Sequence, residues 1–165
     1  TELVGIAYGD RVSLSAQGFY APRGVGYDAS KVYGGGNLFA YYTSGVSCAE
    51  VELDTLTGDF HVLRADVLMD IGTSVNPAID IGQIEGGFAQ GQGLFTLEDP
   101  VWGDEERKWV RPGHLLSTLG VYKIPSFNDV PLDLRIMLLH NAPSDSAVYG
   151  SRAIGEPPLF LASSI

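Results

Sequence analysis

Cysteine is nearly absent from this chain, and basic residues are scarce. Cys48 is the only cysteine in 165 residues, so no disulfide can form within the chain and no Cys-x-x-Cys pair is present to hold zinc or an iron-sulfur cluster. Ten lysines and arginines stand against 20 aspartates and glutamates, which gives a formal net charge of −10. This charge repels phosphate backbones and anionic lipids, so we expect no nucleic-acid partner. The low cysteine content fits a reducing compartment.

Long apolar runs are missing as well. None approaches the roughly 20 residues that span a bilayer, and residues 1–20 lack the basic start and apolar stretch of an export signal. Hydrophobic residues still make up 45% of the chain, enough to fill the core of one globular domain. We therefore expect a soluble domain without a membrane partner. Because the chain opens at Thr1 and ends inside the apolar segment 159–165, we expect residues 1–165 to be a piece truncated at both ends.

Glycine, in contrast, is abundant. The chain has 21 glycines, roughly twice the usual share of about 7%, without a collagen-like triplet period. Such a composition predicts many tight turns and close backbone approaches. Two stretches are expected to be loops, the glycine-rich tract 34–37 and the acidic stretch 99–111. Neither loop is expected to separate two cores.

Two neighbouring stretches have the alternating pattern of a β-hairpin. In residues 48–54, acidic side chains alternate with apolar ones, which is typical of a strand with one wet face. Residues 61–70 repeat the alternation, and residues 55–58 between the two stretches have turn chemistry. The core-facing side of the second strand is expected to hold Leu63, Ala65, Val67 and Met69.

A glycine-rich helix is predicted after the hairpin. Asn76 before Pro77 is typical of an N-cap followed by a first-turn proline, so we expect a helix from Pro77 to the mid-90s. Each internal glycine weakens such a helix by up to about 1 kcal/mol relative to alanine, so several of them need an outside compensation. The helix would contain Gly82, Gly86, Gly87, Gly91 and Gly93. The spacing of four within the first two pairs puts each pair on one face, where either a packed helix or a flat ligand can come close.

A further strand is predicted at residues 131–140, which are rich in leucine, isoleucine and methionine and precede a polar turn at 141–144. Strands and helices that follow one another without regular alternation favour an α+β fold.

The segment 155–159 is the strongest candidate for chemistry. Glu156 precedes two prolines that fix the local backbone. The apolar run after it would form a helix whose first turn holds the carboxylate near exposed amide groups. Carboxylates are ionised at neutral pH and serve as general bases when an apolar pocket raises their basicity. The same pattern also describes an acidic helix-start residue without any function, and residue types alone leave both interpretations open.

Other polar residues give weaker signals. Three histidines share no metal-ligand spacing and are expected to be surface or packing residues: His61, His114 and His140. Three serines lack the context of a nucleophile elbow: Ser117, Ser144 and Ser151. The acidic run 104–106 is most simply a solvated loop, with a weak calcium site as the alternative. We therefore assign no metal ligand to the chain.

Three longer stretches point in one direction: DRVSLS at 10–15, NPAIDIGQIEG at 76–86 and VYGSRAIGEPPL at 148–159. Together with the hairpin at 50–59 and YKIP at 122–125, they resemble the xanthine dehydrogenase and aldehyde oxidase family of molybdenum hydroxylases. The resemblance covers nearly the whole chain in fixed order, which makes it more specific than any short motif. It implies that residues 1–165 are a C-terminal segment of the molybdenum-cofactor-binding domain, with a β-hairpin followed by a glycine-rich helix.

The resemblance implies a role for two residues. Glu156 matches the family's catalytic base, which takes a proton from the oxygen that attacks an electron-poor carbon of the substrate. Gln83 matches a glutamine that lies against the molybdenum-molybdopterin cofactor, which would give the glycine-rich helix a reason for its bare face. The protein contributes positioning and proton transfer, while the cofactor carries the redox chemistry.

The form Gly155-Glu156-Pro157-Pro158 resembles xanthine dehydrogenases more than aldehyde oxidases, which implies a purine substrate taken from hypoxanthine through xanthine to urate. An aldehyde or N-heterocycle hydroxylase and a non-catalytic module that keeps the fold are the alternatives. The family further implies that the remaining domains of the intact enzyme pass electrons through two [2Fe-2S] clusters and FAD to NAD or oxygen. It also implies a homodimer, located in the cytoplasm or in peroxisomes. The isolated segment is expected to be inactive.

Overall fold

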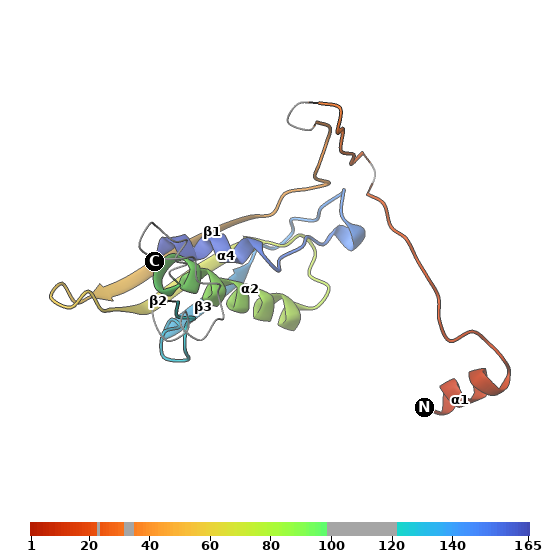
Figure 1. The fold of residues 1–165 in the computed structure, drawn as a ribbon, viewed down its shortest axis with the longest axis horizontal. Coiled ribbons are helices and arrows are strands. Elements are labelled where there is room, and N and C mark those ends of the chain that lie inside the picture. Colours follow the sequence, from red (N-terminus) through yellow and green to blue (C-terminus); the bar gives the residue numbers. More distant parts are fainter. Residues whose placement is uncertain (23, 32–34, 99–121) are drawn as a thin grey trace, which may run out of the picture. The chain divides into compact units, whose positions relative to one another are not determined.

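The computed structural model describes residues 1–22, 24–31, 35–98 and 122–165, which fall into two units (Figure 1). Unit 1 comprises residues 1–40 and contains helix α1, Glu2–Gly9, none of whose residues is buried. Unit 2 comprises residues 41–165 and holds every buried hydrophobic side chain found in the described part of the chain. The boundary follows the expected loop at 34–37, and the described residues form one core; the expected loop at 99–111 lies outside them. No helix among them is long and apolar enough to cross a membrane.

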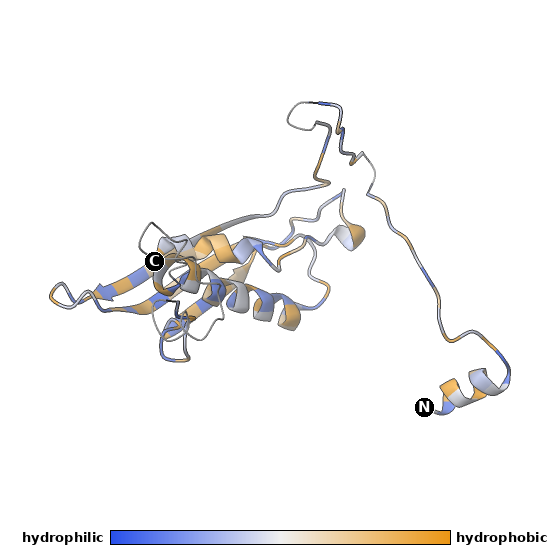
Figure 2. Ribbon diagram, in the orientation of Figure 1, coloured by the Kyte–Doolittle hydropathy of each residue, from blue (hydrophilic) through white to orange (hydrophobic). Residues whose placement is uncertain are grey.

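A three-stranded sheet is the frame of unit 2. Strands β1, Ser44–Leu53, and β2, Phe60–Asp70, form the predicted antiparallel hairpin, along which hydrophilic and hydrophobic residues alternate (Figure 2). Strand β3, Asp133–Leu138, lies parallel to β2 on its other side. The hairpin turn closes through backbone hydrogen bonds between Asp54 and Asp59 and between Gly58 and Asp54, each 2.8 Å long. Together with the helices, this mixed sheet confirms the predicted α+β class.

A β-bulge changes which side chains of β2 face the core. The pairing runs from Glu50 with Arg64 directly to Val51 with Val62, so Leu63 has no partner on β1. The extra residue reverses the alternation, because side chains beyond a bulge point to the opposite faces. Val62 is therefore buried and Leu63 is only partly buried, which makes the expected core position of Leu63 wrong. Ala65, Val67 and Met69 are buried as predicted.

Helices cover the core face of the sheet. Helix α2, Pro77–Gln92, begins as predicted, since the Asn76 side chain accepts hydrogen bonds from the amides of Ala78 and Ile79. A π-helical turn, η1 at Gly93–Leu97, extends it into the mid-90s. Ile84 and Phe88, one turn apart, enter the core cluster.

The C-terminal part of the chain packs against α2. It contains the 3-10 turn η2 at Val148–Gly150, helix α4 at Pro157–Leu161 and the 3-10 turn η3 at Ala162–Ser164. Helix α4 contacts both α2 and β1, and the Ser47 hydroxyl on β1 donates a hydrogen bond to the carbonyl of Leu161. The end of the chain is thereby fixed to both the sheet and the long helix.

An ion pair on β2 gives the fold a predictable response to acid. Arg64 donates two hydrogen bonds to Asp66, with Nε to Oδ2 at 2.6 Å and Nη2 to Oδ1 at 2.8 Å, and these hold the pKa of Asp66 below its ordinary value. A lowered folded-state pKa stabilises the fold above the ordinary pKa of aspartate, and the stabilisation is lost as the pH falls through the folded-state value. We expect Asp66→Asn to lower the thermal unfolding midpoint of the parent protein by more at pH 7 than at pH 3. Equal shifts at both pH values would contradict this assignment.

Candidate functional site

Glu156 lies at the N-cap of α4 and its side chain is exposed. The carboxylate makes no capping hydrogen bond, so the expectation that helix amides hold it is wrong. Pro157 and Pro158 have no amide hydrogen, and the next amide, that of Leu159, donates to the backbone carbonyl of Glu156 at 3.0 Å. The first turn therefore offers the carboxylate no free donor. The side chain is positioned by the backbone alone.

Buried residues on both sides of Glu156 fix that backbone. Ile154 is 7% exposed and belongs to the core cluster, and Pro158 is fully buried. A residue with an exposed side chain between two buried anchors has little freedom to move its Cα. The backbone of residues 155–158 is therefore fixed in place, and it holds the exposed Glu156 carboxylate.

Gln83 lies next to this backbone segment, residues 155–158. It is exposed on α2, and its Oε1 atom is 3.6 Å from the position that a Cβ on Gly155 would occupy. The glutamine side chain thus lies beside the residue directly before Glu156, although 73 positions separate Gln83 from Glu156 in the sequence (156 − 83 = 73). The structure brings the neighbourhoods of the two predicted site residues together.

The glycines of α2 fall into two groups. A Cβ on Gly87 would lie 3.0 Å from Cβ of Pro158, and one on Gly91 would collide with the Leu159 carbonyl and lie 2.8 Å from Cβ of Ala162. These two glycines let α4 pack closely on α2, so helix packing accounts for this pair. Gly82 and Gly86 are exposed, and no atom of the described residues lies within 4 Å of the Cβ position of either. Packing against other described helices therefore does not account for glycine at positions 82 and 86.

The segment that leads to Glu156 is tied to the end of β2. Arg152 donates its amide to the carbonyl of Ile71 at 2.8 Å, and its guanidinium pairs with Asp70. Asp70 also accepts a hydrogen bond from the amide of Gly72 at 3.0 Å, while Gly72 and Ser151 form an isolated β-bridge. Sequence reasoning missed this pair, because no local pattern connects two residues that meet only in the folded chain.

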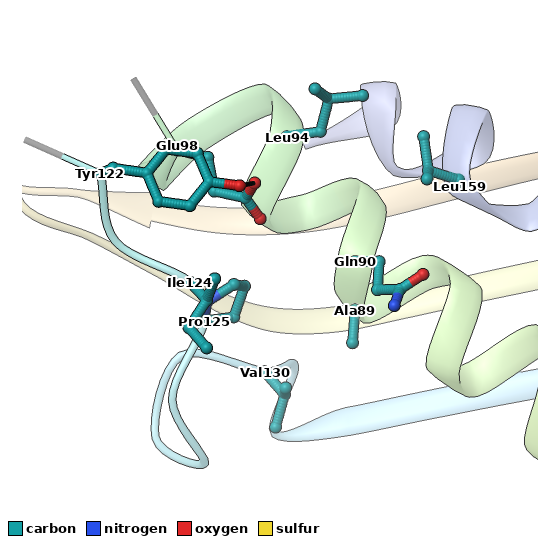
Figure 3. A pocket seen from close by; sticks show the side chains of 9 residues that line it. All are labelled: Ala89, Gln90, Leu94, Glu98, Tyr122, Ile124, Pro125, Val130 and Leu159. Carbon is teal, nitrogen blue, oxygen red and sulfur yellow. Dashed lines mark hydrogen bonds between the residues drawn. The ribbon is translucent and has the colours of Figure 1, made fainter. Parts of the chain in front are cut away.

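The pocket drawn in Figure 3 lies elsewhere on α2. It has a volume of about 510 Å³ and is lined by Ala89, Gln90, Leu94, Glu98, Tyr122, Ile124, Pro125, Val130 and Leu159. The Tyr122 hydroxyl donates to the Glu98 carboxylate at 2.6 Å, and this hydrogen bond raises the pKa of Tyr122 above its ordinary value. Gln83 and Glu156 do not line this pocket. Among the described residues that line it, Glu98 is the only carboxylate, so they form no carboxylate dyad.

The remaining candidates gain no support as sites. Over the described ranges, no group of three or more histidine, cysteine, aspartate or glutamate side chains is placed to hold a metal ion. His61 is exposed on β2 and His140 follows β3. Ser144 is buried and Ser151 takes part in the bridge to Gly72. His114, Ser117 and the acidic run 104–106 lie outside the described residues.

Comparison with known proteins identifies close relatives. The sequence profile described as the molybdopterin cofactor-binding domain matches residues 1–131. Xanthine dehydrogenase 1 of Arabidopsis thaliana is 53% identical over 166 aligned positions, which cover 100% of this chain and 12% of that protein. The chain therefore spans about 12% of the length of that curated relative. Glu156 lies beyond the profile match but inside the aligned region of the relative.

Solved structures share the fold. The quinoline 2-oxidoreductase from Pseudomonas putida 86 is 36% identical with a TM-score of 0.60, over 70% of this chain and 14% of that one. The aldehyde oxidoreductase from Desulfovibrio gigas is 33% identical with a TM-score of 0.61, over 76% of this chain and 13% of that one. In each case the chain corresponds to a small part of a much larger polypeptide.

Proposed function

We propose a function for this chain, which belongs to the molybdopterin cofactor-binding domain family. In its parent protein, this segment forms one side of the molybdenum-cofactor site of a xanthine dehydrogenase-type hydroxylase. Glu156 is the catalytic base and Gln83 lies against the cofactor. The observation that carries the proposal is the position of Gln83 beside Gly155, because it brings the open face of α2 close to the backbone that holds the exposed Glu156 carboxylate.

The surface around Gln83 fits a flat, polar cofactor. Gly82 and Gly86 leave open space where side chains would otherwise project, so a planar group can approach the helix backbone. The amide of Gln83 offers two donors and an acceptor beside that open surface. The residues of this chain that would hold the cofactor are therefore Gln83, Gly82 and Gly86. When bound, the molybdenum cofactor supplies the two-electron oxidation of the substrate carbon.

Glu156 supplies the proton transfer. Its carboxylate makes no capping hydrogen bond, so its oxygens remain available to accept a proton from the oxygen nucleophile that attacks the substrate. The buried residues Ile154 and Pro158 hold its backbone on either side. A base positioned in this way loses little conformational freedom when substrate binds.

A purine is the substrate that the relatives favour. The full-length alignment to a xanthine dehydrogenase at 53% identity supports oxidation of hypoxanthine or xanthine, and so does the Gly155-Glu156-Pro157-Pro158 form. The structural likeness to a quinoline 2-oxidoreductase and an aldehyde oxidoreductase supports the second candidate, an aldehyde or N-heterocycle hydroxylase. Turnover of xanthine and of an aromatic aldehyde by the complete parent polypeptide separates them. Turnover of xanthine alone is the expected result, and turnover of the aldehyde alone favours the second candidate.

The same relationship supports a proposal for the whole parent enzyme. Its other domains carry two [2Fe-2S] clusters and FAD, which pass electrons to NAD or oxygen. We propose that it acts as a homodimer in the cytoplasm or in peroxisomes. The non-catalytic alternative makes the opposite prediction: a purified parent protein of that kind contains no molybdenum.

The role of Gln83 leads to a test of cofactor binding. We expect Gln83→Ala to reduce the molybdenum content per polypeptide by about tenfold or less, on the order of one lost hydrogen bond. Activity per bound molybdenum should fall less than it does on loss of Glu156. Gln90→Ala is the matched control, because Gln90 is an exposed glutamine on the same helix that lines the separate pocket. A Gln83→Ala protein that matches wild type in metal content and activity would remove Gln83 from the site.

A further inference from the structure

We infer that the Asp70–Arg152 ion pair positions Glu156, which makes both residues positioning residues for the proton transfer. The inference rests on the proposed function of Glu156 for its effect on rate. Its structural part, that the pair holds the segment 151–156 in place, does not depend on that function.

The two side chains are among the less exposed charged groups of unit 2. Their side chains are 17% exposed for Arg152 and 19% for Asp70, compared with 41% and 28% for the Arg64–Asp66 pair. A partly buried pair is screened less by solvent than a surface pair, and removing one partner leaves the other charge poorly solvated. Without Asp70, the guanidinium would retain the carbonyl of Ala142 at 3.5 Å, the one other partner recorded for it among the described residues.

The pair lies at the start of the segment that ends at Glu156. Asp70 is the last residue of β2 and is itself fixed by the amide of Gly72. Gly72 has a φ of 68°, and a Cβ at this position would collide with the Gly150 carbonyl, so only glycine fits there. Arg152 is thus held to the sheet through both its backbone and its side chain.

Weaker ties follow between Arg152 and the buried anchor. The amide of Ala153 donates to the Tyr41 hydroxyl at 3.2 Å, and its carbonyl accepts from the Thr43 hydroxyl at 3.1 Å. Both partners are hydroxyls of exposed or partly exposed residues. The ion pair is therefore the strongest side-chain tie in the segment, and Ile154 is its only core anchor before Glu156.

Loss of the pair should move the carboxylate rather than unfold the chain. A misplacement of about 1 Å at a reacting group lowers rate by up to about a hundredfold. We expect Arg152→Gln and Asp70→Asn in the complete parent enzyme to lower the rate of enzyme reduction by saturating xanthine, per bound molybdenum, by about tenfold to a hundredfold. The double variant should be no slower than the slower single variant, because both substitutions break one interaction. Arg152→Lys should restore part of the rate.

A second readout needs neither cofactor nor turnover. In the cofactor-free parent protein, hydrogen exchange at the amides of residues 151–156 should become faster in Arg152→Gln than in wild type. Arg64→Gln is the matched control, since it breaks an ion pair on the same strand and should change neither this exchange nor the reduction rate. Unchanged exchange in Arg152→Gln would overturn the inference that the ion pair holds residues 151–156 in place. Faster exchange with a rate within twofold of wild type, or additive losses in the double variant, would overturn its role in positioning.

These outcomes separate the inference from the proposed function. If Glu156→Gln keeps the wild-type rate, the proposed base is wrong, whatever the exchange experiment gives. If Glu156→Gln is inactive and Arg152→Gln is not slower per molybdenum, the base stands and the positioning pair is wrong.

Discussion

Replacing Glu156 by glutamine in the complete parent polypeptide should leave its molybdenum content unchanged and slow xanthine hydroxylation by about two to four orders of magnitude. The substitution keeps the size of the side chain and removes its ability to accept a proton, which is the contribution expected of a general base. The fold should not respond, since the carboxylate is exposed and makes no capping hydrogen bond. The measurement is the rate of enzyme reduction by saturating xanthine, per bound molybdenum.

The control for this substitution is Glu52→Gln. Glu52 is an exposed glutamate on β1, so the change removes the same charge from the same chain at a position outside the proposed site. It should leave the rate within twofold of wild type. A Glu156→Gln enzyme as fast as this control would remove Glu156 from the mechanism.

Alanine substitutions of two glycines in α2, Gly91 and Gly82, should change the stability of the fold in opposite directions. Gly91→Ala inserts a methyl group against the Leu159 carbonyl and 2.8 Å from Cβ of Ala162. Overpacking of this kind costs roughly 1–3 kcal/mol and here must push α4 away from α2. We expect a lower thermal unfolding midpoint, faster hydrogen exchange in α4, and a slower reaction because α4 carries Glu156 at its start.

Gly82→Ala is the matched substitution in the same helix. Its new methyl group meets open space, and alanine favours a helix over glycine by about 1 kcal/mol, so the cofactor-free protein should become slightly more stable. For cofactor binding the same substitution should be unfavourable, because the methyl group would occupy the surface that the cofactor approaches. We therefore expect lower molybdenum content in Gly82→Ala. Equal stability of Gly91→Ala and Gly82→Ala would contradict the packing analysis, and normal metal content in Gly82→Ala would contradict the proposed cofactor surface.

Local sequence signals predicted the local structure well. The hairpin follows from the alternation around Glu50 and Glu52, and the start of α2 follows from Asn76 and Pro77, because each signal acts through neighbouring residues. The bulge at Leu63 was missed, since one added residue in a strand leaves no mark on an alternating pattern until its partner is known. The parallel pairing of β3 with β2 was also beyond reach, because strand pairing depends on the course of the intervening chain.

The candidate site was predicted unevenly for the same reason. Glu156 and Gln83 were chosen from motifs, and their proximity through Gly155 exists only in the folded chain. The glycine pairs were recognised as two faces, but the sequence gives no indication of which face packs under α4 and which stays open. The amides expected to hold Glu156 are removed by the two prolines that made the segment conspicuous.

Glu156 and Gln83 are proposed to face one cofactor from the same side of the site. An experimental structure of the complete parent polypeptide with its molybdenum cofactor and a bound purine tests this most directly. It should show the Glu156 carboxylate within hydrogen-bond reach, about 2.6–3.2 Å, of the group whose proton it takes. The Gln83 amide should contact the cofactor in the same cavity. A Glu156 side chain that points into bulk solvent, or a cofactor bound away from the Gly82–Gly86 face of α2, would contradict the account.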